Sequence, residues 1–226
     1  MSINKHLATS IVLLSAFLIL AMLVSPRLDN NNSALLREDT SLFLYINKSH
    51  YNYPFNQFMI WMTQYGREVV WSITILLFLI FGSWTGGKKV AMVMIISMIV
   101  LVPIGIVTKE IVARVRPVIP KTDFLIAADL EYSFPSGHTI IVSSGAVNAL
   151  LLFKGSRKKL TISLALTIEA VLVSFSRVYV GGHYPLDIGG MLLGVGISLI
   201  FIWKIEYVED YIITRFYRKD IKNSKL

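Results

Sequence analysis

Long apolar runs alternate with short polar connections along most of this chain. Six apolar segments can be counted, at about residues 7–24, 68–84, 90–108, 138–153, 160–177 and 185–203. A helix needs about 20 residues to cross the hydrocarbon core of a bilayer, and most of these segments approach that length. Backbone groups inside a bilayer must be bonded within their own segment, so each segment is expected to be a helix. The pattern predicts an all-α, polytopic membrane protein with six transmembrane helices in a single domain, residues 1–226.

The first connection, residues 27–66, is the longest on its side of the predicted membrane. Its last part, YPFNQFMIWMTQYG, is rich in aromatic residues and methionine but is too short to cross a bilayer. We therefore expect a short interfacial or re-entrant helix in this first outer loop.

Composition agrees with a membrane protein. Hydrophobic residues make up 54% of the chain, the mean hydropathy is +0.63, and only 16% of the residues are charged, against about 25% in soluble domains. The net charge of +8 does not indicate a nucleic-acid partner, because much of it lies in short loops and in the C-terminal tail. The chain has no cysteine, which excludes disulfides and thiolate metal sites.

Lysine and arginine set the predicted orientation. They concentrate on one side of a six-helix arrangement, and the positive-inside rule makes that side cytoplasmic. Both termini are then cytoplasmic in a multi-pass protein of the cell membrane, and residues 204–226 form a basic cytoplasmic tail that either lies on anionic lipid or stays solvated. The loop cations on this side are Lys5, Lys88, Lys89, Lys154, Arg157, Lys158 and Lys159.

Three short motifs hold most of the side chains capable of chemistry. They are KEIVARVRP (residues 109–117), PSGH (135–138) and SRVYVGGHYPLD (176–187). Each motif comes at the end of an apolar segment, and the predicted topology places all three on the outer membrane face. Together they supply cations, histidines, a serine and a carboxylate, which suffice to hold a phosphate and break its ester bond.

In the first motif, Lys109 and Arg116 are seven residues apart, or two helical turns, and are expected to share one face of a helix that Pro117 stops. The guanidinium of Arg116 can hold two phosphate oxygens, and Lys109 acts as a compact point charge. Arg114 lies off this face and is assigned no direct role. Taken alone, the motif fits better a pair of cations that snorkel to the membrane surface.

In the second motif, Ser136 is a good N-cap and Gly137 lets the backbone come close to a ligand. A helix that starts here directs free N–H groups and its positive dipole end at the loop, which favours an anion. His138 follows directly and can donate a proton to a leaving oxygen. An ordinary capped helix start followed by an interfacial histidine would have the same sequence pattern.

The third motif is the most specific. Arg177 ends the fifth apolar segment, and His183 follows Gly181 and Gly182, which keep its approach clear of side chains. Asp187 comes four residues after His183 in a first helical turn, where a carboxylate is favourable in any case. We interpret Asp187 as the acceptor of a hydrogen bond from one ring nitrogen of His183. The other ring nitrogen is then left to face phosphorus.

The three motifs together follow the pattern K-x6-R-P, P-S-G-H and S-R-x5-H-x3-D over about 80 residues. In this the chain resembles the phosphatidic acid phosphatase type 2 superfamily, which also includes class A bacterial acid phosphatases and vanadium haloperoxidases. Its membrane character indicates the integral-membrane lipid phosphatase branch. The matching positions are Lys109, Arg116, Pro117, Pro135, Ser136, Gly137, His138, Ser176, Arg177, His183 and Asp187.

The resemblance implies a lipid phosphatase that needs no metal or other cofactor, because three protein cations take the metal's place. His183 would attack phosphorus and become a phosphohistidine, and Asp187 would orient it. His138 would protonate the departing oxygen and then activate water. The phosphoryl oxygens would be held by Lys109, Arg116, Ser136, Gly137 and Arg177.

The substrate and the final acceptor stay open at this point. Polyprenyl diphosphate is the favoured lipid, with phosphatidic acid or phosphatidylglycerophosphate as the alternative. An alcohol in place of water would make the enzyme a phosphotransferase, and a non-catalytic lipid-phosphate or anion carrier would need only the cations. The aromatic segment before residue 67 either forms a wall for the lipid tail or simply anchors the chain.

Overall fold

The computed structural model describes residues 5–28, 33–48, 52–83, 86–118, 125–126 and 130–223, with side chains described up to residue 208. The described residues are almost entirely helical, as the apolar pattern predicts. The helices are α1 (Lys5–Val24), α2 (Ala34–Lys48), α3 (Tyr53–Tyr65), α4 (Trp71–Phe81), α5 (Gly87–Val112), α6 (Gly137–Leu152), α7 (Arg157–Tyr179) and α8 (Gly190–Asn223). Three shorter helical segments are the 3-10 helices η1 (Pro26–Leu28) and η4 (Pro185–Gly189) and the π-helical turn η2 (Gly66–Val70).

Five stretches in the described part of the chain are long and apolar enough to cross a membrane. They are Lys5–Val24, Tyr53–Phe81, Gly87–Val112, Arg157–Tyr179 and Pro185–Val208. Helix α6 is apolar but has only 16 residues. The prediction of an all-α, polytopic membrane protein is therefore confirmed, while the number of six crossings stays a prediction.

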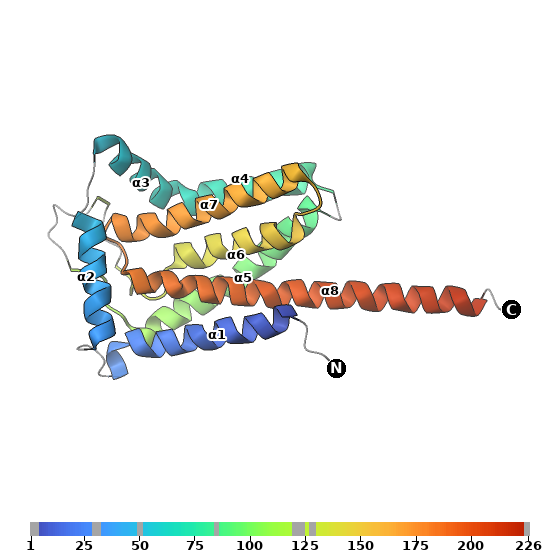
Figure 1. The fold of residues 1–226 in the computed structure, drawn as a ribbon, viewed down its shortest axis with the longest axis horizontal. Coiled ribbons are helices and arrows are strands. Elements are labelled where there is room, and N and C mark those ends of the chain that lie inside the picture. The colour runs from blue at the N-terminus through green and yellow to red at the C-terminus, as the bar shows by residue number, and fades with distance from the viewer. Residues whose placement is uncertain are drawn as a thin grey trace.

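Helix α6 is the central element of the bundle. It packs against α5, α7 and α8, and α1 packs on the outer side of α8 (Figure 1). Because these neighbours surround α6, its first turn lies within protein rather than lipid, where unpaired N–H groups are tolerated. The PSGH motif thus opens inside the bundle, at the level where the other two motifs leave α5 and α7.

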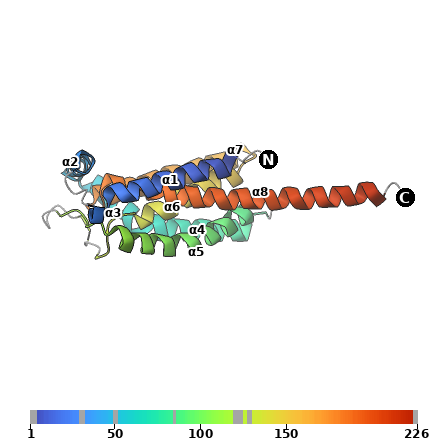
Figure 2. The same cartoon turned by 90° about the horizontal axis from the view of Figure 1, so that it is seen from below.

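Helix α2 lies across the end of the bundle at which α5 ends and α6 begins (Figures 1 and 2). Two buried side chains fasten it there. Asn47 Nδ2 donates to the Tyr179 carbonyl at 3.0 Å, and Asp39 Oδ1 accepts from the Leu186 N–H at 2.9 Å. The start of α1 and the long C-terminal part of α8 lie at the opposite end. The segment expected to be a tail continues α8 as far as Asn223, and residues 224–226 lie outside the described residues.

The aromatic segment of the first connection is helical, as expected, but it does not turn back. Helix α3 runs through the π-turn η2 into α4, and Tyr53–Phe81 forms one apolar stretch of 29 residues. The π-turn lies against α7 at Gly66, where a methyl group would come 2.3 Å from Cγ2 of Val173. Only glycine allows the π-helical segment to approach α7 this closely. The approach places the next residue, Arg67, at the end of the bundle that holds the motifs.

Candidate active site

Helix α5 ends earlier than the sequence suggests. Ala113 adopts a left-handed φ of 55°, and its N–H donates to the Lys109 carbonyl at 2.8 Å, so the last helical residue is Val112. The chain then leaves the helix and is held by the Ser133 N–H, which donates to the Arg114 carbonyl at 2.8 Å. A left-handed alanine is uncommon, and nothing in the local sequence marks it.

This early end corrects the expected geometry of the first motif. Lys109 and Arg116 do not share a helical face, and Pro117 does not stop the helix, because both Arg116 and Pro117 lie beyond its end. Lys109 reaches the motifs from the last turn of α5, and Arg116 reaches them from the loop. The two cations still meet at one place.

That place is a cavity of about 410 Å³, here called the cationic cavity. It lies where the three motifs converge, at the end of the bundle crossed by α2. Six of the residues predicted from the sequence line it, together with three that were not predicted. The predicted ones are Lys109, Arg116, Gly137, His138, Arg177 and His183, and the others are Arg67, Leu130 and Glu131.

His183 is held at both ring nitrogens. Its Nδ1 lies 3.3 Å from Asp187 Oδ2, and its Nε2 lies 3.2 Å from Arg116 Nη1 at the cavity. The side chain is 2% exposed, so only the edge that faces the cavity can meet a ligand. Asp187 lies behind the ring and does not line the cavity, and its Oδ2 also accepts from the Tyr184 N–H at 2.9 Å.

The glycine pair before His183 shapes the loop. Gly181 has a φ of 94°, which is costly for residues with a side chain. A methyl group on Gly182 would lie 3.2 Å from Arg177 Nη2, so this backbone runs close over the guanidinium. The His183 N–H donates to the Arg177 carbonyl at 3.1 Å, which closes the loop back onto the end of α7.

Three hydrogen bonds to neutral oxygens help to fix the two guanidinium groups. Arg116 donates to the carbonyls of Glu131 and Gly182, both at 2.7 Å. Arg177 is 3% exposed and donates to Thr63 Oγ1 on α3 at 2.8 Å. Planar guanidinium groups held in this way suit the paired oxygens of a phosphate.

The start of α6 completes the cavity. Ser136 occupies the N-cap position, as predicted, but its side chain does not cap the helix. Ser136 is not among the residues that line the cavity: its hydroxyl is fully buried and has no hydrogen-bond partner among the described residues. The N–H groups of the first turn, which include those of Gly137 and His138, have no partner within the helix. Such a helix start stabilises an anion.

Ser176, the remaining serine of the signature, lies outside the cavity. Its hydroxyl is buried and donates to the Val173 carbonyl within α7 at 2.7 Å. It therefore belongs to the packing of α7, next to Arg177.

Arg114 has two buried carboxylate partners that helical spacing does not predict. Its Nη1 donates to Asp187 Oδ1 at 2.7 Å and its Nη2 to Asp39 Oδ2 at 2.5 Å. Its guanidinium also lies over the ring of Tyr184, 4.2 Å from the centroid. Arg114 thus connects α2 to the carboxylate behind His183, a structural role that its position in the sequence does not predict.

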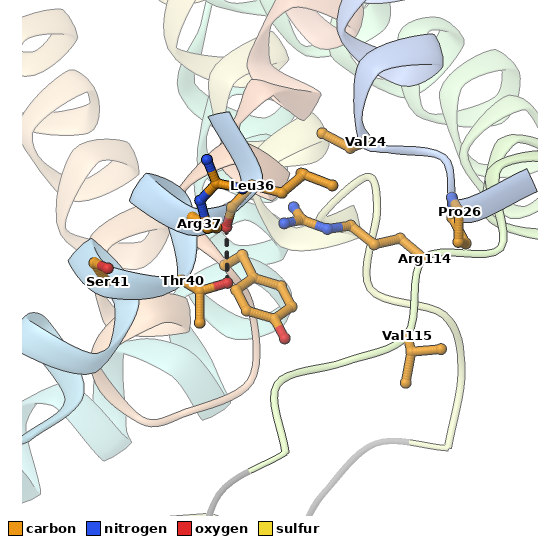
Figure 3. A pocket seen from close by; sticks show the side chains of 9 residues that line it. Val24, Pro26, Leu36, Arg37, Thr40, Ser41, Arg114 and Val115 are labelled. Carbon is orange, nitrogen blue, oxygen red and sulfur yellow. Dashed lines mark hydrogen bonds between the residues drawn. The ribbon is translucent and has the colours of Figure 1, made fainter. Parts of the chain in front are cut away.

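Figure 3 shows Arg114 reaching toward α2 across a pocket of about 510 Å³. Burial raises the pKa of the Asp39 carboxyl, and the neighbouring guanidinium of Arg114 acts in the opposite direction. The ion pair is therefore what favours an ionised carboxylate at Asp39 in this buried position.

Glu131 is a second unexpected member of the cavity. Its carboxylate accepts from Lys109 Nζ at 2.5 Å, and its own side chain is 68% exposed. An entering phosphate would compete with this carboxylate for Lys109. Glu131 lies between the first two motifs, and no spacing in the sequence indicates that it returns to Lys109.

Replacing Glu131 with glutamine is therefore expected to lower KM about 2- to 5-fold with little change in kcat, since an exposed ion pair is worth at most about 1 kcal/mol. Steady-state phosphate release by the purified protein measures both constants. Glu110→Gln, on the exposed side of α5, is the matched control and should change neither constant. An unchanged or raised KM in Glu131→Gln would show that Glu131 does not compete with the substrate.

Comparison with known proteins agrees with this geometry. The PAP2 superfamily matches residues 86–210, more than half of the chain. An undecaprenyl-diphosphatase of Sulfolobus acidocaldarius is 40% identical over 194 residues, which are 84% of this chain and 88% of that protein. An undecaprenyl-diphosphatase of Bacillus subtilis is 28% identical over 166 residues, which are 73% of this chain and 82% of that protein.

A solved structure extends the likeness to the fold. The crystal structure of a transmembrane PAP2 type phosphatidylglycerolphosphate phosphatase from Bacillus subtilis superposes with a TM-score of 0.73 at 24% identity. The superposition covers 88% of this chain and 97% of that one. The chain therefore belongs to the PAP2 superfamily, in its integral-membrane lipid phosphatase branch.

Proposed function

We propose that this protein removes the terminal phosphate of a polyprenyl diphosphate to give polyprenyl phosphate and inorganic phosphate. The observation that carries the proposal is the cationic cavity, in which His183 Nε2 faces a space bounded by Lys109, Arg116 and Arg177. The names of the relatives from Sulfolobus acidocaldarius and Bacillus subtilis support the substrate class.

In the first step, His183 Nε2 attacks the terminal phosphorus, and a P–N bond forms as the bond to the leaving oxygen breaks. Asp187 accepts the hydrogen bond from Nδ1 and stabilises the positive ring. His138, which also lines the cavity, gives a proton to the departing oxygen and becomes neutral. Charge on the transferred phosphoryl group is held by Lys109, Arg116, Arg177, Ser136 and the Gly137 N–H.

In the second step, a water molecule replaces the lipid and attacks the phosphohistidine. The neutral ring of His138 accepts a proton from this water, the P–N bond breaks, and inorganic phosphate leaves. His183 is neutral again, and the cycle consumes only water. An alcohol in the position of the water would instead make the reaction a phosphoryl transfer.

The location of the reaction is part of the proposal. Loop cations at the end opposite the cavity, such as Lys88, Lys89, Lys158 and Lys159, favour a cytoplasmic position for that end. The cavity then opens at the outer face of the cell membrane, with both termini inside.

Glycerolipid phosphates are the competing substrates. The predicted phosphate-binding residues contact only phosphate oxygens in this mechanism, so they do not by themselves distinguish phosphatidic acid or phosphatidylglycerophosphate from a prenyl diphosphate. A non-catalytic lipid-phosphate carrier would need the cations but would have no use for the second histidine.

We expect the purified protein to release phosphate from a prenyl diphosphate at an unchanged rate in EDTA, because Lys109, Arg116 and Arg177 supply the charge that a metal would otherwise provide. The assay compares a prenyl diphosphate, phosphatidic acid and phosphatidylglycerophosphate in the same detergent, with and without chelator. Faster turnover of the glycerolipids would overturn the substrate assignment. Activity that EDTA removes and added Mg²⁺ restores would overturn the mechanism.

A further inference from the structure

Arg67 is a fourth cation of the cationic cavity, and none of the steps above uses it. It lies in the π-turn η2 and reaches the cavity from the wall formed by α3 and α4, whereas the other cations come from α5, its following loop and α7. Glu68 accepts hydrogen bonds from its Nε and Nη2. These contacts direct the remaining nitrogen, Nη1, to within 3.5 Å of His138 Nδ1.

This position is on the side of the leaving group. His183 is the attacking group and His138 is the proton donor to the departing oxygen, so the two histidines mark opposite ends of the bond that breaks. Arg67 is adjacent to His138 and, unlike Arg116, has no contact with His183 among the contacts described for it. A charge at Arg67 therefore acts on the part of the substrate that leaves.

A second, apolar pocket of about 190 Å³ begins at the same point. It shares Arg67, Lys109, Glu131 and Gly137 with the cationic cavity. Here this space is called the apolar side pocket, and its remaining lining comes from Leu101, Val102, Gly105, Ile106, Ile140 and Ile141 of α5 and α6. Val102 and Ile106 are 48% and 56% exposed, so the pocket borders the surface that faces lipid. Arg67 stands where the phosphate space meets the hydrocarbon space.

The two kinds of substrate place different groups at that boundary. In a phosphate monoester the departing oxygen belongs to an alcohol, which needs a proton and is followed directly by hydrocarbon. In a diphosphate the departing group is itself a phosphate ester, whose second pKa is about 6, so it can leave as an anion. A guanidinium beside the leaving oxygen contributes little when a protonated alcohol leaves. It stabilises the leaving group of a diphosphate, which stays negatively charged.

We infer that Arg67 is a specificity-determining residue that binds the lipid-linked phosphate of a diphosphate substrate. The inference rests on the proposed function and names the residue that makes it selective. The terminal phosphate lies among Lys109, Arg116 and Arg177, the second phosphate lies beside Arg67 and His138, and the lipid chain continues into the apolar side pocket. Arg67 holds the prenyl phosphate product as it forms.

The test is Arg67→Gln, assayed on farnesyl diphosphate and on farnesyl monophosphate. Loss of a hydrogen bond to a charged group should lower kcat/KM for the diphosphate about 10- to 100-fold. The monophosphate value should fall much less, so that the ratio of the two substrates changes about 10-fold or more. Arg67→Lys should restore part of the diphosphate activity, because it keeps the charge without the planar donor pair. Arg157→Gln, at the far end of α7, is the matched control and should leave the ratio unchanged.

A binding measurement separates recognition from a role in positioning His138. With the monophosphate as reporter, inhibition by methylenediphosphonate should weaken about 10-fold in Arg67→Gln, and inhibition by inorganic phosphate should change far less. An equal fall for both substrates, with both inhibitors unaffected, would mean that Arg67 only positions His138 and would overturn the inference. An unchanged ratio of kcat/KM for the two substrates would also overturn the inference. If the wild-type protein releases phosphate from neither lipid, it is the proposed function that fails.

Discussion

Replacing His183 with alanine is expected to lower phosphate release by at least about 1,000-fold, because no other side chain can take over the attack on phosphorus. Binding of a phosphate analogue should persist, since Lys109, Arg116 and Arg177 remain. Turnover of a prenyl diphosphate and binding of vanadate by the same preparation measure the two effects. Trapping the enzyme with substrate labelled at the terminal phosphate should give an acid-labile adduct in the wild type and none in the variant.

The chain provides a matched control for this substitution. His6 lies near the start of α1, with Nε2 3.6 Å from Glu206 Oε1, at the end of the bundle opposite the cavity. His6→Ala removes the same side chain and should leave turnover unchanged. If His183→Ala retains more than about a tenth of the wild-type rate, His183 is not the nucleophile and the three motifs serve another purpose.

Local patterns were enough to predict the described helices other than α2 and most of the cavity lining. Apolar runs of about bilayer length are helical because a bilayer offers no other way to bond the backbone. The residues that line the cavity from the motifs, such as His138 and His183, lie beside helix ends that glycine and proline mark in the sequence. Loops at helix ends on one face of a bundle are necessarily neighbours, so their meeting in one cavity followed from topology.

The end of α5 was predicted incorrectly because no residue near it in the sequence indicates where the helix stops. Helix termination in the left-handed region is usually carried out by glycine, and here Ala113 does it. Contacts with a distant segment compensate, since Ser133 binds the carbonyl of Arg114. Helical spacing therefore gave the wrong reason for bringing Lys109 and Arg116 together, although both line the cavity.

The residues that were missed come from segments far apart in the chain. Asp39 meets Arg114 across 75 positions, and Arg67 meets His138 across 71. Neither pair lies on a shared helix, and no spacing rule connects them. One signal was available for Arg67, since it is an arginine directly before an apolar segment on the predicted outer side. A cation at that position would be close to the motifs if its helix were their neighbour.

Replacing Arg114 with methionine is expected to have the largest effect on stability. The change leaves Asp39 and Asp187 as neighbouring buried carboxylates without their cation, which costs about 3–5 kcal/mol. For a chain of this size that corresponds to a fall in Tm of about 10 °C, measured by thermal unfolding in detergent. Asp39→Asn should cost less, because an amide keeps the acceptor for the Leu186 N–H.

The same substitution tests whether Arg114 is a positioning residue for catalysis. Arg114 does not line the cationic cavity, so KM and vanadate binding should stay near the wild-type values. The value of kcat should fall about 100-fold, because Asp187 loses the contact that holds it against His183 Nδ1. Arg27→Met is the matched control, since Arg27 donates to the Glu110 carbonyl at the same end of the bundle and reaches neither carboxylate. A fall in Tm with kcat unchanged would show that Arg114 only holds α2 in place. A loss of kcat in Arg114→Met that does not occur in Asp39→Asn would assign the effect to the contact between Arg114 and Asp187.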